Sequence, residues 1–195
     1  MRKKGTNGKE SRRRLLDAAA EEFALSGFYQ TKVSSIVARA GVTQPAFYLY
    51  FESKEEVFAE LVDEFQSQLS ELVENSRLEP GKAIHDVRNE VQTALVNGFR
   101  FLSGNPALTR IGFFQSRESV HIKAKLAMML EEKMELEREA GYFRTDVDLS
   151  FAAEALIGIM ERLTLTKLLP GRDDPVHLAE QTRLLLFNGL LLNGD

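Results

Sequence analysis

The sequence contains no cysteine and no tryptophan, and only three histidines. Disulfides, thiolate metal sites and cysteine nucleophiles are therefore excluded, and a histidine-rich metal centre is not expected. Long apolar runs are missing too: the longest late one, Leu184 to Leu192, is interrupted by Asn188 and Gly189 and is too short to span a bilayer. The basic start lacks the apolar stretch that a secretory signal needs. We therefore expect a cytoplasmic protein with no membrane partner.

Signatures of catalysis are also scarce. The sequence has no glycine-rich phosphate loop, no HExxH pair and no nucleophile elbow. Neighbouring acids such as Glu131 and Glu132 fit a solvated helix surface. We therefore expect no enzymatic activity, no cofactor and no metal.

Charge is unevenly distributed along the chain, although the overall formal charge is only −4. Residues 1–54 carry ten Lys or Arg against five Asp or Glu, a balance of +5, whereas the remaining 141 residues carry 15 basic and 24 acidic side chains, a balance of −9. A basic beginning on an acidic remainder favours a polyanionic partner at one end of the molecule only. A basic segment that merely aids solubility is the competing explanation.

Apolar residues recur at helical spacing almost throughout, and the alternation typical of strands is nearly absent. This pattern predicts an all-α fold of about nine helices, with a three-helix head followed by a helical bundle. Capping residues such as Thr31, Thr43 and Ser53, and glycines such as Gly41, set the predicted ends. The predicted helices cover residues 9–25, 32–40, 43–50, 53–75, 80–102, 106–115, 119–140, 148–169 and 175–192.

Residues 33–52 form a predicted helix-turn-helix motif with its turn at Gly41. Five residues should face inward and hold the two short helices together: Ile36, Ala40, Val42, Phe47 and Tyr50. The outward face of the second helix bears hydrogen-bonding side chains that fit a DNA major groove. We expect Gln44 to pair with a base edge and Pro45 to touch a thymine methyl. The predicted DNA-binding residues are Thr31, Lys32, Thr43, Gln44, Pro45, Tyr48 and Lys54, of which Thr31, Lys32, Tyr48 and Lys54 are expected to hold phosphates.

These same residues resemble the tetracycline-repressor (TetR) family over roughly residues 9–60. The resemblance rests on Ala18 to Phe23, Gly27-Phe28, Thr31, Ile36, Ala40-Gly41-Val42, Phe47 to Phe51 and Ser53-Lys54-Glu55. It implies a homodimeric transcription regulator that binds double-stranded DNA through a recognition helix at about residues 44–50. It also implies two domains, a DNA-binding domain at 9–55 and a domain for ligand sensing and dimerisation at 56–195.

The last two predicted helices have more apolar surface than one core needs, and this excess predicts a four-helix interface between two copies. The predicted interface residues are Leu156, Met160, Leu163, Leu184, Phe187 and Leu191. Packing within a single chain is an equally good explanation of any one of them.

Aromatic and methionine residues gather in the middle helices, where they predict a mostly apolar pocket for a small effector of unknown identity. The predicted lining is Phe99, Phe113, Phe114, Arg117, Met128 and Met160; ordinary core packing is the alternative. With such a pocket, the protein is expected to be a repressor that leaves a palindromic operator when the effector binds. Without one, it would be a DNA-bound interaction protein that acts through a protein partner.

Overall fold

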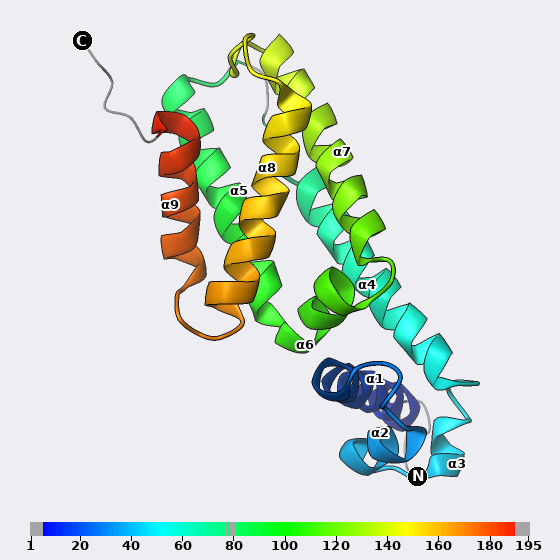
Figure 1. The fold of residues 1–195 in the computed structure, drawn as a ribbon. Helices are drawn as coiled ribbons and strands as arrows, with labels where there is room; N and C mark the ends of the chain where they lie inside the picture. Colours follow the sequence, from blue (N-terminus) through cyan, green and yellow to red (C-terminus); the bar gives the residue numbers. More distant parts are fainter. Residues whose placement is uncertain (1–5, 77, 79–80, 190–195) are drawn as a thin grey trace. The chain divides into compact units, whose positions relative to one another are not determined.

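The computed structural model describes residues 6–76, 78 and 81–189, and within these ranges it contains nine α-helices and no strand. The predicted all-α class is therefore confirmed (Figure 1). The helices are α1 (Thr6–Ser26), α2 (Val33–Ala40), α3 (Gln44–Phe47), α4 (Lys54–Glu74), α5 (Ile84–Gly104), α6 (Pro106–Thr109), α7 (Ser119–Glu139), α8 (Leu149–Leu163) and α9 (Pro175–Asn188). Two π-helical turns, η1 (Arg110–Gln115) and η2 (Thr164–Leu168), continue α6 and α8.

The helices fall into two compact units. Among the described residues, the first comprises those up to 67 together with 107–119, and the second comprises those in 68–106 and from 120 onward. The return of 107–119 to the first unit was not predicted, because sequence patterns do not show which distant segments pack together. The first unit extends to residue 67, whereas the DNA-binding domain was expected to end at residue 55.

In the first unit, α1 packs against α2, and α2 against α3. Phe23, Phe47 and Phe51 supply large side chains that are completely or almost completely buried. Arg39 ties α2 to α1 through ion pairs of 2.6 Å to both Glu21 and Glu22. Buried aromatic volume thus fixes the head, and the ion pairs orient α2 on α1.

Helix α4 and the turn η1 meet in the same unit through Phe65 and Phe113, whose ring centroids are 6.0 Å apart. Gly112 lets the backbone of η1 pass directly over Phe65: an added Cβ would overlap the ring and lie 2.9 Å from the Cβ of Phe65. Phe65 is fully buried and has no room to move aside. A side chain at position 112 is therefore incompatible with this packing.

We expect Gly112→Ala to lower the free energy of unfolding by about 1–3 kcal/mol, the usual cost of overpacking a core. Gly104→Ala is the matched control, because nothing lies within 4 Å of the Cβ it would add. Alanine favours a helix over glycine, so the control should be neutral or slightly stabilising. Thermal unfolding of both variants tests the contact, and an unchanged midpoint in Gly112→Ala would contradict it.

In the second unit, α5 and α9 run side by side in extensive contact, and η2 packs against α5 (Figure 1). Val87 and Phe99 of α5 and Leu178 and Ala179 of α9 are buried in this core. Lys123 of α7 pairs with Glu161 of α8 at 2.6 Å, which ties these two helices together.

Most predicted helix boundaries lie within a few residues of the observed ones, and three were wrong. The N-cap of α2 is Lys32, not Thr31, and no side chain caps it. Helix α3 ends at Phe47, and residues 48–50 form a turn. Helix α5 begins at Ile84; position 80, where this helix was expected to begin, and 190–192, the expected end of the last helix, lie outside the described residues.

Asp148 and Asp174 cap α8 and α9 through their side chains. The Asp148 carboxylate accepts a hydrogen bond from the Phe151 N–H at 3.0 Å, and Asp174 accepts from the N–H groups of Val176 and His177 at 2.9 and 3.1 Å. No helix in the described ranges is long and apolar enough to cross a membrane.

Candidate nucleic-acid interface

The turn between α2 and α3 depends on Gly41, which adopts the left-handed conformation with φ of 62°. Its N–H and that of Val42 donate back to the carbonyls of Ala38 and Val37, closing the end of α2. Arg14 of α1 donates to the Ala40 carbonyl. An L side chain would be strained at position 41, so glycine is what allows the chain to reverse here.

Helix α3 is only one turn long and is held from behind by aromatic side chains. Phe47 is fully buried, and its ring lies 5.6 Å from that of Phe51. Thr43 occupies the predicted N-cap position with extended backbone, but its side chain makes no capping bond. A helix this short has little stability of its own. Phe47 and Phe51 therefore fix its position.

The side chains expected to face outward do so. Thr43, Gln44 and Pro45 are exposed, and Tyr48 is 54% exposed. Of the residues expected inside, Ile36, Ala40 and Phe47 are buried, whereas Val42 and Tyr50 are half-buried.

Leu49 is an exposed residue that was not predicted: 79% of its surface is accessible. Helical spacing does not apply to it, because α3 has ended and the turn points Leu49 away from the core. An exposed leucine next to Tyr48 offers an apolar contact of the kind that suits a thymine methyl.

A shallow depression of about 580 Å³ joins the beginning of α2, the exposed side of α3 and the beginning of α4. Five of the seven predicted DNA-binding residues line it: Thr31, Lys32, Gln44, Tyr48 and Lys54. Ser34, which was not predicted, also lines it, as do the acids Glu52 and Glu55. The structure thus brings most of the predicted residues to one surface.

Thr31 has a different role from the one expected. It is only 2% exposed, and its hydroxyl donates to the carbonyls of Glu22 and Gly27 at 3.1 and 2.8 Å. The hydroxyl therefore ties the loop after α1 to the end of that helix. In this conformation it is not available to a phosphate, and it does not cap α2 either.

Lys54 is also engaged inside the head. Its ammonium donates to the carbonyls of Phe28 and Thr31, each at 2.9 Å, and lies 4.6 Å from the centroid of the Phe28 ring. A phosphate would have to compete with these acceptors. Lys32, in contrast, is exposed and the described residues give its side chain no hydrogen bond or ion pair.

We expect Lys54→Met to lower the free energy of unfolding by about 1.5–3 kcal/mol, because a charged group loses its hydrogen bonds to carbonyls. Lys32→Met removes the same charge from the exposed edge and should leave stability unchanged. It should instead reduce the slope of log K for DNA against log salt by roughly one per contact. Thermal unfolding and DNA binding at several salt concentrations separate the two roles. A Lys54→Met protein of normal stability would contradict the view that Lys54 stabilises the head.

The six residues expected to line an effector pocket are divided equally between the two units. Phe113, Phe114 and Arg117 belong to the first unit, where Arg117 donates to the Tyr29 hydroxyl. The other three belong to the second unit: Phe99, Met128 and Met160. Met128 is 61% exposed, and Met160 covers Gly98, where an added Cβ would lie 2.7 Å from the methionine methyl.

The residues expected at a dimer interface differ in exposure. Leu156 is buried in the core of its own unit, and Leu191 lies outside the described residues. The other four are half-buried: Met160, Leu163, Leu184 and Phe187. The most exposed apolar side chain on these helices is Phe151, at 73%, and Leu165, Leu185 and Leu186 are exposed too.

Comparison with known proteins agrees with a helix-turn-helix head. Residues 15–61 match the model for bacterial regulatory proteins of the tetR family. The chain is 46% identical over 190 residues to the HTH-type transcriptional regulator YdgC of Bacillus subtilis (strain 168), itself described as uncharacterized, and the match covers 97% of both proteins. It is 24% identical over 185 residues to the fatty acid metabolism regulator protein of the same organism, covering 90% of this chain and 93% of that protein.

Solved structures share the fold over nearly the whole chain. The fatty acid degradation regulator FadR from Bacillus halodurans has a TM-score of 0.72 at 25% identity and covers 97% of this chain and 98% of its own. The transcriptional regulator FadR from Bacillus subtilis in complex with stearoyl-CoA has a TM-score of 0.70 at 21% identity, with 92% and 99% covered. With the exposed recognition helix and the full-length match to a regulator, these findings show that the chain belongs to the tetR family of bacterial regulatory proteins and is a DNA-binding transcriptional regulator.

Proposed function

We propose that the protein is a repressor that binds a palindromic operator as a homodimer and leaves it when a fatty acyl-CoA binds. The observation that carries the proposal is the head itself: Gln44, Pro45 and Tyr48 stand exposed on a helix that Phe47 fixes from behind. Such a helix presents hydrogen-bonding groups to a major groove without having to reorganise.

Roles at the operator follow from placement. Gln44 at the start of α3 would make two hydrogen bonds to an adenine edge, and Pro45 and Leu49 would contact thymine methyls. Thr43, Tyr48 and Lys32 would hold phosphates on either side of the groove. A DNA partner supports the cytoplasm as the proposed location.

The effector class is inferred from relatives. A regulator of fatty acid metabolism is related over 90% of this chain, and a structural neighbour was solved with stearoyl-CoA. Binding would favour a dimer whose two heads no longer match the spacing of the half-sites, and DNA affinity would fall by the ligand's differential affinity for that state. The second candidate, regulation through a protein partner without a small molecule, is favoured if no acyl-CoA changes DNA binding.

The test is release of the purified protein from DNA by stearoyl-CoA. Genomic fragments selected by the protein would supply the operator, and fluorescence anisotropy would follow the complex. Release at micromolar stearoyl-CoA, with none by CoA alone, supports the proposal. An operator complex that is unaffected by acyl-CoA of any chain length would overturn the effector class and leave DNA recognition standing.

Dimerisation is proposed to use α8 and α9. Phe151 of α8 and Leu165 of its π-helical continuation are exposed apolar side chains, and Gly158 between them is exposed too. Exposed apolar side chains that gather on a surface are typical of a protein interface. Leu184 and Leu185 of α9 extend the proposed interface.

We expect Phe151→Asp and Leu185→Asp each to turn the dimer into a monomer at micromolar concentration, because a charge would be buried without a partner. Both side chains are exposed in the single chain, so the variants should still fold. Leu156→Asp is unsuitable, because Leu156 is buried in the core. Sedimentation measures the mass; a wild-type monomer, or dimers in both variants, would contradict this interface.

A further inference from the structure

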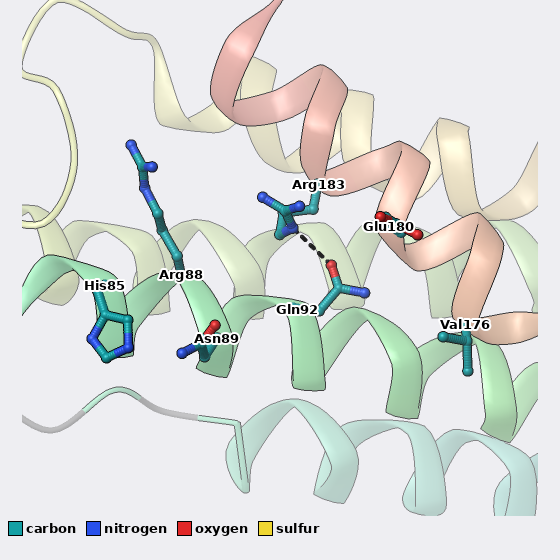
Figure 2. A pocket seen from close by; sticks show the side chains of 7 residues that line it. All are labelled: His85, Arg88, Asn89, Gln92, Val176, Glu180 and Arg183. Atoms are coloured by element: carbon teal, nitrogen blue, oxygen red, sulfur yellow. Dashed lines mark hydrogen bonds between the residues drawn. The ribbon is translucent and has the colours of Figure 1, made fainter.

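A groove of about 460 Å³ lies between α5 and α9 in the second unit, away from every residue assigned above to DNA. Figure 2 shows side chains from both helices around it. The lining residues are His85, Arg88, Asn89 and Gln92 from α5, and Val176, Glu180 and Arg183 from α9. The volume exceeds that of a single inorganic ion and lies in the usual range for small-molecule sites of about 300–1,000 Å³.

Two guanidinium groups face this groove, and neither forms an ion pair in the part of the chain that the structure describes. The Nε of Arg183 donates to the Gln92 side-chain oxygen at 2.9 Å (Figure 2). This hydrogen bond orients the guanidinium group and leaves its two terminal nitrogens to donate to a ligand. The Arg88 guanidinium lies 5.9 Å from the centroid of the Phe187 ring. Each arginine is thus positioned by a neutral partner that does not cancel its charge.

The groove is electrically asymmetric. His85, Arg88 and Asn89 lie at one end in Figure 2, Arg183 and Gln92 lie in the middle, and Glu180 and Val176 lie at the other end. Asp86 contacts His85 at 2.9 Å and lies outside the lining. The arginine end therefore suits an anion, whereas the Glu180 end suits a hydrogen-bond donor.

This groove differs from the proposed dimer interface. Val176, Glu180, Arg183 and Phe187 recur at intervals of three and four residues, so they share one face of α9, turned toward α5. Leu185 lies on the opposite side of α9, whereas Leu184, four residues after Glu180, borders the groove face. A second copy seated on the Leu185 side would leave the arginines accessible.

We propose that this groove binds a phosphate-bearing small molecule of the nucleotide class. The phosphate would lie between Arg88 and Arg183, and a hydroxyl or amino group of the same molecule would donate to Glu180. A phosphate carries up to two negative charges and three acceptor oxygens, which match two arginine forks better than a single carboxylate does. The site is separate from the proposed DNA-binding surface, because the two share no lining residue.

The test is calorimetric titration of the full chain, without DNA, with 5′-AMP, adenosine and succinate. We expect 5′-AMP to bind at one site per chain and adenosine and succinate to bind at least about tenfold more weakly, since each lacks the phosphate. Arg88→Gln and Arg183→Gln should each weaken 5′-AMP binding by about tenfold or more. Glu180→Gln removes the charge of the one acid among the lining residues. It should weaken the contact with adenosine or ribose groups, because a neutral amide oxygen accepts a hydrogen bond less strongly than a carboxylate, while inorganic phosphate binds more tightly.

Arg100→Gln is the matched control, because it removes the same charge from the same helix at an exposed position outside the groove. It should leave 5′-AMP binding unchanged, and circular dichroism should show that all variants fold. Equal losses in Arg100→Gln and Arg88→Gln would show that only net charge matters and would overturn the site. So would adenosine or succinate binding as tightly as 5′-AMP, or no 5′-AMP binding at millimolar concentration.

Discussion

Replacing Gln44 by alanine is expected to cost about 1–3 kcal/mol of affinity for the operator, equivalent to roughly 5- to 150-fold, and to relax the preference at one base pair per half-site. Gln44 is exposed in the first turn of α3, the part of a recognition helix that meets base edges. Its amide can donate and accept at once, which matches adenine; alanine can do neither.

Lys32→Met serves as the comparison for this variant. The loss of affinity caused by Lys32→Met should be the same for operator and scrambled DNA, because a phosphate contact carries no sequence information. Titrations of both variants against duplexes changed at single positions measure the difference. If Gln44→Ala kept the full base preference, its assignment as the base-reading residue would be wrong.

Replacing Phe47 by alanine is expected to abolish operator binding by unfolding the head. Phe47 is completely buried, and truncating such a side chain costs about 3–5 kcal/mol. Whole domains are stable by only about 5–15 kcal/mol, and α3 has one turn with no side-chain cap to stabilise it. Losing the Phe47 side chain should therefore disorder α3 before it affects the second unit.

Hydrogen exchange measures this local effect. Amides of α1 and α2 should lose protection in Phe47→Ala, whereas those of α5 and α9 should keep it. Leu49→Ala is the control, because Leu49 is largely exposed and its truncation should leave protection unchanged. Normal operator binding by Phe47→Ala would contradict the view that buried aromatics fix the recognition helix.

Local chemistry allowed much of this fold to be predicted from the sequence. Gly41 acts through neighbours within four residues, and its predicted turn is present. Asp148 and Asp174 act equally locally when they cap α8 and α9. Helical spacing likewise placed Ile36 and Phe47 inside the head. Such features depend on a short stretch of chain and are therefore readable from it.

Contacts between distant residues could not be predicted in this way. Lys54 donates a hydrogen bond to the carbonyl of Phe28, and Thr31 donates one to that of Glu22. Two side chains expected to contact phosphates therefore stabilise the head instead. The groove residues Arg88 and Arg183 are far apart in sequence and become neighbours only when α9 packs on α5. The predicted effector residues remain a prediction for the same reason: helical spacing indicates which face of a helix a residue occupies but not which distant segment packs against that face.

The measurement that tests the central claim most directly is an anisotropy titration of the wild-type protein with a duplex selected from genomic DNA and with its scrambled version, at one physiological salt concentration. We predict two chains per selected duplex and affinity at least about 10³-fold higher than for the scrambled duplex, the usual margin for specific recognition. Equal affinity for the two duplexes would contradict the claim that the exposed face of α3 reads DNA sequence.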